Sequence, residues 1–202
     1  MKFTCEKNTL QDAVSVCLHA VAAKSSIAVL EGILVIAGDN VLDFSLTRFV
    51  RYAKGKNTSC IMRYYEQNTQ KLTKCGVVEP DGQDRVVSME EKPANPKSNL
   101  ASMGIHVFSW DKLRKYLIED EKKKDSSNDF GKDVIPAMLN SNQKMYAYPF
   151  EGYWKDVGTI SSLWEANMEI MEPETSGINL FDEDWKIYSR NSGLPGHKIG
   201  EN

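Results

Sequence analysis

Acidic and basic side chains follow apolar runs at three places in the sequence, where they can bind a metal ion or a phosphorylated sugar. Asp39 follows the run ILVIAG, Glu91 and Lys92 come soon after RVVSM, and Asp156 follows an aromatic pair. A carboxylate at a strand end can hold Mg²⁺, which is usually shared with substrate phosphates. A neighbouring Glu-Lys pair can accept sugar hydroxyl protons and donate to a phosphate. Each position is also typical of a solvated turn, and spacing alone does not decide between these interpretations.

Glycine and histidine positions add less information. Gly76 and Gly104 can let the backbone approach a ligand closely. The histidines, His19, His106 and His197, do not have metal-ligand spacing, and His106 is interpreted as a packed strand residue. The sequence contains no GxSxG, HExxH or P-loop pattern, which gives no support to the enzyme classes that use them.

Composition indicates a globular domain. The 202 residues are 41% hydrophobic and 26% charged, which excludes a disordered chain, and the net charge of -3 makes DNA an unlikely partner. Four cysteines without CxxC spacing are typical of reduced thiols, so we expect a cytoplasmic protein. No apolar run is long enough to span a membrane, and the first residues do not resemble a signal peptide.

Strand and helix patterns alternate along the chain, which predicts an α/β sheet layered with helices and ligands at strand ends. Strands are expected at 33–37, 58–65, 72–78, 85–89, 102–108 and 145–150. Helices are expected at 8–21, after Ser45, at 111–119, from Ser127 or Asn128 through Leu139, and from Thr159 to about Met171. Pro136 is expected to end or kink its helix. Residues 154–159 are predicted to form a polar turn.

Residues 98–202 closely resemble bacterial glucose-1-phosphate adenylyltransferases. The matching pieces are SNLASMGIHVF (98–108), SSNDFGKDVIPAML (126–139), YPFEGYWKDVGTISSLWEANM (148–168) and FDEDWKIYSRN (181–191). Residues 35–97 resemble another sugar-1-phosphate nucleotidyltransferase, closer to the thymidylyl- or uridylyltransferases, through VIAGDNVLDFSL, CGVVEPDG and RVVSMEEKP.

Residues 1–34 resemble the start of the DNA polymerase III β sliding clamp, through MKFTCEKNTLQDAV and VLEGIL. The clamp ring is much longer, so a DNA-encircling function is not expected. An alternative break near Thr47 would assign residues 36–47 to a clamp hairpin. The preferred division is a clamp-like head at 1–34, a partial transferase domain at 35–175 and a linker at 176–202.

These resemblances imply a fold, a reaction and a set of site residues. The fold is an incomplete Rossmann-like (GT-A-like) nucleotidyltransferase domain with a mixed sheet, lacking its first part and its C-terminal left-handed β-helix. The reaction is in-line attack of glucose 1-phosphate, or a related hexose 1-phosphate, on the α-phosphate of a nucleoside triphosphate. With ATP it yields ADP-glucose and pyrophosphate for glycogen biosynthesis. By resemblance, Asp39 and Asp156 bind Mg²⁺, Glu91, Lys92, Gly76 and Ser102 bind the sugar phosphate, and Lys92 and Asp156 are the catalytic pair.

One feature of the family is missing, and it leaves three interpretations. The family begins with a glycine-rich GGxGTRL loop and a downstream lysine that bind the nucleotide, and neither occurs here. The chain is therefore interpreted as an inactive transferase, as a non-catalytic partner of complete transferase subunits in a possible homo-oligomer, or as a clamp fragment. The first interpretation predicts that Asp39 and Asp156 face one cleft with Glu91 and Lys92 on its rim.

Overall fold

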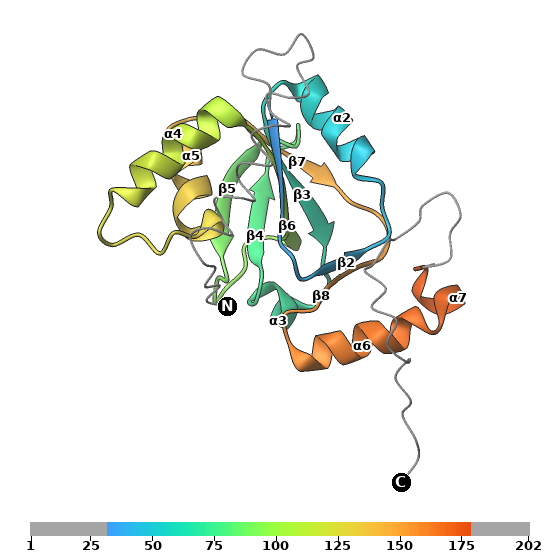
Figure 1. Ribbon diagram of the computed structural model, residues 1–202. Coiled ribbons are helices and arrows are strands. Elements are labelled where there is room, and N and C mark those ends of the chain that lie inside the picture. The colour runs from blue at the N-terminus through green and yellow to red at the C-terminus, as the bar shows by residue number, and fades with distance from the viewer. Residues whose placement is uncertain (1–31, 179–202) are drawn as a thin grey trace, which may run out of the picture.

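The computed structural model describes residues 32–178, which form a mixed sheet with helices on both faces (Figure 1). The strands across the sheet are β5 (Val86–Glu91), β4 (Gly76–Pro80), β6 (Leu100–Ser109), β3 (Ser59–Tyr65) and β7 (Met145–Pro149), and β1 (Gly32–Ile36) also pairs with β6. Among the strands of residues 32–178, only β3 and β7 pair in parallel, whereas the other ladders of this sheet are antiparallel. The predicted α/β fold with a mixed sheet is confirmed.

The long strand β6 organises this sheet. Along one edge it pairs with β3, since Ala101 lies opposite Tyr64 and Val107 lies opposite Cys60. Along its other edge β6 pairs first with β4, through Ala101, and then with β1, through residues 105–109. The end of β1 and the start of β4 therefore meet at the middle of β6.

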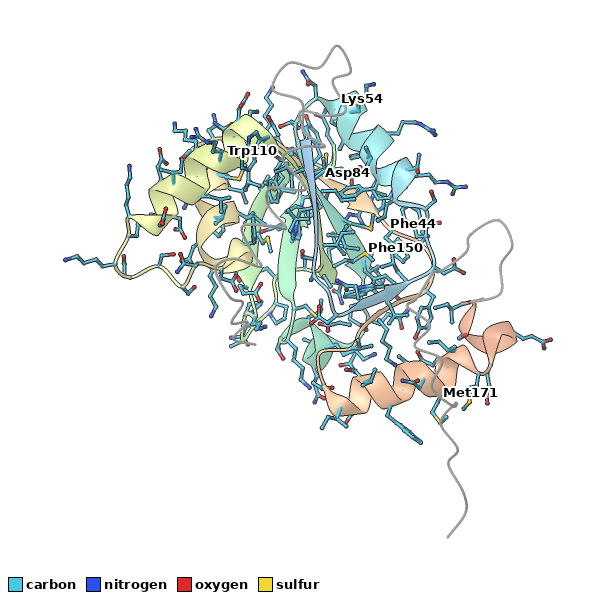
Figure 2. The ribbon with its side chains drawn as sticks, in the orientation of Figure 1. Phe44, Lys54, Asp84, Trp110, Phe150 and Met171 are labelled. Atoms are coloured by element: carbon cyan, nitrogen blue, oxygen red, sulfur yellow. The ribbon has the colours of Figure 1, made fainter. Side chains whose placement is uncertain are left out.

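Successive residues of the central strands point to opposite faces and create two cores. Ile61 packs in one core under α4 (Trp110–Glu121) and α5 (Ile135–Asn140), and Met62 packs in the other under α2 (Leu46–Lys56). In the second core Phe44 and Phe150 meet edge to face, with ring centroids 5.2 Å apart (Figure 2). The apolar periodicity of the sequence therefore places helices on both faces.

Two predicted elements differ from the structure. The strand expected at 72–78 begins only at Gly76, because residues Thr69–Leu72 form the short helix α3, whose first turn is capped by Asn68. The helix expected from Ser127 or Asn128 is instead capped by Asp129 and begins as a π-helical turn, η2 (Phe130–Val134), before α5. Pro136 lies in the first turn of α5, where its missing N–H has little consequence.

The segment predicted as a polar turn contains a third difference, which bears directly on the site. Residues Trp154–Asp156 form the strand β8, which pairs with β2 (Asn40–Leu42) in a separate two-stranded sheet (Figure 1). Helix α6 (Ile160–Ile170) follows and is capped by Thr159 in a capping box with Ser162, and α7 (Pro173–Ser176) comes next.

Residues 1–31 of the predicted head, including the helix expected at 8–21, and residues 179–202 of the predicted linker lie outside the described residues, whereas residues 32–34 of the head begin β1. Within residues 32–178, none of the helices has the length and apolar character needed to cross a membrane.

His106 is a buried polar residue in β6, and it stacks on Phe108 with ring centroids 5.5 Å apart. Its Nε2 has no hydrogen-bond partner among the described residues. Burial lowers the pKa of His106 to about 4 because it penalises the charged imidazolium. The native state therefore keeps this ring neutral.

We expect His106 to make folding stability fall with decreasing pH. The unfolded histidine binds a proton below about pH 6.5, whereas the folded one does so only near pH 4. Its contribution to the free energy of unfolding should drop by about 2 kcal/mol between about pH 7 and about pH 5. In urea unfolding of His106→Phe, the free energy of unfolding should therefore fall by about 2 kcal/mol less than that of the wild type over the same pH range. An unchanged pH dependence in the variant would contradict this account.

Candidate active site

A cavity of about 1000 Å³ lies between β8 and α6 on one side and, on the other, α3 and the segment 73–75 that precedes β4. Three of the predicted site residues line it, namely Asp39, Lys92 and Asp156. Its wall also includes Tyr64, Glu66, Lys71, Lys74, Cys75, Tyr153, Trp154, Lys155, Gly158, Thr159, Glu165 and Glu169.

The β2–β8 ladder brings the two predicted metal ligands together. Asn40 lies opposite Asp156 in this ladder, and the Val157 N–H donates to the backbone oxygen of Asp39 at 2.8 Å. A Cβ added to Gly158 would lie 3.0 Å from Asp156 Oδ1 and 3.3 Å from Asp39 Oδ2. The two carboxylates thus approach the same point, and a glycine leaves that point open.

Gly104 and Asn40 fix the segment that carries Asp39. The Ala37 N–H donates to the Gly104 oxygen at 2.9 Å, and Gly104 has a φ of 67°. A Cβ at Gly104 would lie only 3.0 Å from the Ala37 Cβ. The sequence predicted that Gly104 lets the backbone approach a ligand, but in the structure the neighbour that it approaches closely is Ala37. The Asn40 side chain donates to the Ala37 oxygen and accepts from Trp154 Nε1, at 2.9 and 2.7 Å. Asn40 therefore connects β1 to β8.

The predicted sugar-binding residues gather beside this cavity. Gly76 lies opposite Glu91 in the β4–β5 ladder. A Cβ at Gly76 would lie 2.9 Å from Glu91 Oε2 and 3.5 Å from the Ser102 Cβ. Of this group, only Lys92 is among the residues that line the cavity. The structure thus brings all the predicted site residues into one region, in two adjoining groups.

Lys92 has a strained backbone that turns it away from the sheet. Its φ is 50°, which is costly for a residue with a Cβ, and its N–H donates to the Cys75 oxygen at 3.0 Å. Its Nζ lies 3.6 Å from Glu91 Oε1, and its side chain is 59% exposed. The turn places a loosely paired cation at the edge of the cavity.

Burial is the main cause of the raised pKa of Glu91, and the nearby Asp129 carboxylate raises it further. The ammonium group of Lys92 acts in the opposite direction. The protonated form of Glu91 is therefore favoured more than in an exposed glutamate.

Residue spacing did not reveal the ion-pair network that connects β8 to α6. Lys155 Nζ lies 2.8 Å from Glu165 and 2.7 Å from Glu169, and the Tyr153 hydroxyl donates to Glu169 at 2.6 Å. Burial alone lowers the pKa of Lys155, but the hydrogen bonds to the two glutamates outweigh it and raise the pKa. In the sequence, the spacing of the two glutamates by one helical turn places them on the same face of α6, but it does not indicate that Lys155 is their partner.

Among the residues from 32 to 178, no group of three or more His, Cys, Asp or Glu side chains is placed to hold a metal ion. Two carboxylates facing one point remain consistent with Mg²⁺, which is commonly bound by one or two carboxylates together with substrate phosphates.

The cavity thus presents two aspartates and a lysine on a mixed α/β sheet, which are side chains suited to a metal ion and a phosphate group. A family model for nucleotidyl transferases matches residues 2–173, and the chain belongs to this family. It is 48% identical over 172 residues to a glucose-1-phosphate adenylyltransferase of Clostridium botulinum, which covers 85% of this chain and 44% of the relative. Enzymes of the same name from Clostridium beijerinckii and Bacillus cereus are 46% and 44% identical, with 44% and 45% of their lengths covered.

The chain therefore spans less than half the length of these relatives. An alignment of 172 residues is longer than 98–202, so the similarity to adenylyltransferases extends beyond the segment predicted from its motifs. The family match also begins within the head at 1–34. The sliding-clamp origin of that head stays a prediction, since the structure describes only its last three residues, 32–34.

Tyr153→Phe should weaken the attachment of β8 to α6. The variant loses a hydrogen bond to a charged carboxylate, and such bonds contribute roughly 1.5–3 kcal/mol. We expect the free energy of unfolding to fall by about 1–2 kcal/mol, measured by urea denaturation, since Glu169 can still pair with Lys155. Tyr65→Phe is the matched control, because Tyr65 is 59% exposed. Equal effects of the two substitutions would show that the Tyr153 hydroxyl is not important for this attachment.

Proposed function

We propose that the chain is the sugar-phosphate-binding part of a sugar-1-phosphate nucleotidyltransferase of the glucose-1-phosphate adenylyltransferase type. The observation that carries this proposal is the convergence of Asp39 and Asp156 on one point of a cavity that Lys92 also lines. The names of the relatives support glucose 1-phosphate as the sugar substrate and ATP as the nucleotide, with ADP-glucose and pyrophosphate as products. We extend the proposal to a role in glycogen biosynthesis, which the resemblance of residues 98–202 to these enzymes implies.

The chain's own residues would bind the two ends of the sugar phosphate. The Lys92 ammonium is exposed at the cavity edge and is well suited to a phosphate oxygen. The Glu91 carboxyl accepts from sugar hydroxyls, while Gly76 and Ser102 form the adjoining surface. Because Glu91 and Lys92 are consecutive, one turn of backbone fixes the spacing between the hydroxyl-binding and phosphate-binding groups.

The carboxylates of Asp39 and Asp156 fit a magnesium ion. Both present oxygens to the space beside Gly158, and Asp156 Oδ1 also accepts the Gly158 N–H at 2.8 Å, which orients it. When bound there, Mg²⁺ would neutralise part of the negative charge on the substrate phosphates.

A role as a non-catalytic partner of complete transferase subunits is the second candidate. Helix α6 exposes Ile160 (89%), Leu163 (50%) and Trp164 (56%), and exposed apolar side chains grouped in this way are typical of interaction surfaces. Co-purification with a complete subunit, lost in Trp164→Glu, would support this candidate.

The proposed metal site predicts that Asp39→Asn and Asp156→Asn each weaken binding of Mn²⁺ by roughly tenfold or more. Each variant removes one negative oxygen donor while keeping the side-chain shape. Electron paramagnetic resonance of Mn²⁺ with glucose 1-phosphate present measures the loss. Asp125→Asn, in an exposed loop, is the matched control and should bind like the wild type. Wild-type affinity in both site variants would show that the two carboxylates do not hold a metal.

We expect the chain alone to bind glucose 1-phosphate weakly and to release no pyrophosphate from ATP, UTP or dTTP. The 202 residues do not contain the glycine-rich loop that positions the α-phosphate in this family. Loss of a single preorganised hydrogen-bond donor to the transition state lowers the catalytic rate by a factor of about 10²–10³. A pyrophosphate-release assay with Mg²⁺ and glucose 1-phosphate measures this directly. Release that disappears in Asp156→Asn would contradict the prediction and would indicate a nucleotide site elsewhere in the chain.

A further inference from the structure

Strand β1 has one edge without a strand partner among residues 32–178. It pairs only with β6, in an antiparallel ladder of five residues. Alternate residues of such a strand direct their backbone N–H and C=O groups to opposite edges. Ala37, which follows the strand, directs its N–H to the Gly104 oxygen in β6, so the backbone groups of Val35 also face β6. Those of Leu34 and Ile36 therefore face the open edge.

The side chains of β1 are apolar on both faces of the strand. Its sequence, GILVI, contains no charged residue and no proline, and none of its residues is fully buried. Val35 packs against the core under α4 and α5, whereas Leu34 and Ile36, on the other face, are 36% and 41% exposed. In the neighbouring strand β6, Ile105 and Phe108 are completely buried. A continuous apolar run of this kind is typical of a strand in the interior of a sheet.

The open edge of β1 lacks the features that usually keep sheet edges from pairing. Natural edges are protected by lysines, prolines, bulges or a covering segment. The outer strand β7 is protected in this way, because the Ala147 N–H donates to the Asp84 oxygen at 2.8 Å and Arg85 forms a bridge with Tyr146. Strand β1 has a regular register with β6 and neither charge nor proline, so its edge is ready to accept a strand.

We propose that two copies of the chain associate through their β1 edges, which pair antiparallel about a twofold axis at Leu34. Leu34 then lies opposite Leu34 of the partner subunit, and Ile36 lies opposite Gly32 of the partner subunit. This register pairs every residue of the strand, and the residues whose backbone groups face outward meet one another. It also joins the exposed side chains of Leu34 and Ile36 from both copies into one apolar strip across the ladder.

A second copy is favoured as the occupant because the β1 edge is complementary to itself, as a twofold interface requires. Since β1 has no charge, two copies meet there without like-charge repulsion, although the whole chain has a net charge of -3. A five-residue ladder covers less surface than the roughly 1,200 Å² of a standard interface, so we expect a weak dimer. No residue of β1 lines the cavity, so the dimer does not depend on the proposed function.

Analytical ultracentrifugation of the whole chain, from about 1 μM to about 1 mM, tests the proposal. The average mass should rise from monomer toward dimer with concentration. Leu34→Lys places two ammonium groups opposite each other at the twofold axis, so the dimer Kd should rise roughly tenfold or more. Val87→Lys is the matched control, because Val87 is a 55% exposed residue of β5, and this variant should dimerise like the wild type. Circular dichroism and urea unfolding establish that both variants are folded.

A mixture of two variants tests the register itself. Leu34→Glu alone should dimerise as poorly as Leu34→Lys, because like charges again meet at the axis. An equimolar mixture of the two should recover the dimer, since each ammonium then faces a carboxylate. Mixing does not repair a purely structural defect, so a mixture that stays monomeric would overturn the proposal.

Amide hydrogen exchange of the wild type provides a test without substitutions. Protection of the Leu34 and Ile36 amides should increase with protein concentration, whereas the Val35 amide, which faces β6, should be protected throughout. Protection of Leu34 and Ile36 that does not change with concentration would show that the same chain covers this edge, and the proposal would be wrong.

Two further outcomes of the ultracentrifugation would also overturn the proposal. A chain that is monomeric at every concentration does not pair through β1. A dimer that persists in Leu34→Lys but is lost in Trp164→Glu would assign the interface to α6, where Trp164 is 56% exposed.

Discussion

The pairing of β2 with β8 is the interaction on which the candidate site depends. These are three-residue strands from distant parts of the chain, and Asn40 lies opposite Asp156. So short a ladder has little stability of its own, and other contacts support it. Trp154 Nε1 donates to Asn40, and Lys155 and Tyr153 bind the glutamates of α6. The carboxylates of Asp39 and Asp156 are neighbours only while this small sheet is formed.

The second constraint is the way β6 divides one of its edges between two strands. Because β1 and β4 both pair with that edge, the end of one and the start of the other meet at the middle of β6. Ser102 and Gly104 lie at this point, close to Gly76 and Ala37 respectively. Residues from β1, β4 and β6 are therefore brought together by strand pairing alone, before any ligand contributes to the arrangement.

Much of the fold could be predicted from the sequence, because apolar periodicity records which residues are buried. The strand around Ile61 and the helix with Phe49 on its inner face are examples. Strand β8 could not be predicted in this way, since it is short and polar and pairs only with a distant segment. Motif resemblance named the candidate site residues, but it did not reveal the closeness of Gly131 to Glu91, which depends on how η2 packs against the sheet.

Charge in the site is distributed so that the two groups of residues depend on each other. Lys155 is already paired with two glutamates, so it is not well placed to neutralise a phosphate, whereas Lys71, at 3.9 Å from Glu66, is paired only loosely. Lys92 is paired only loosely with Glu91, at 3.6 Å. Loosely paired lysines at the cavity leave the repulsion between a phosphate and the carboxylates of Asp39 and Asp156 in place. In the function we propose, a sugar phosphate therefore binds well only when a divalent cation lies between those carboxylates and the phosphate.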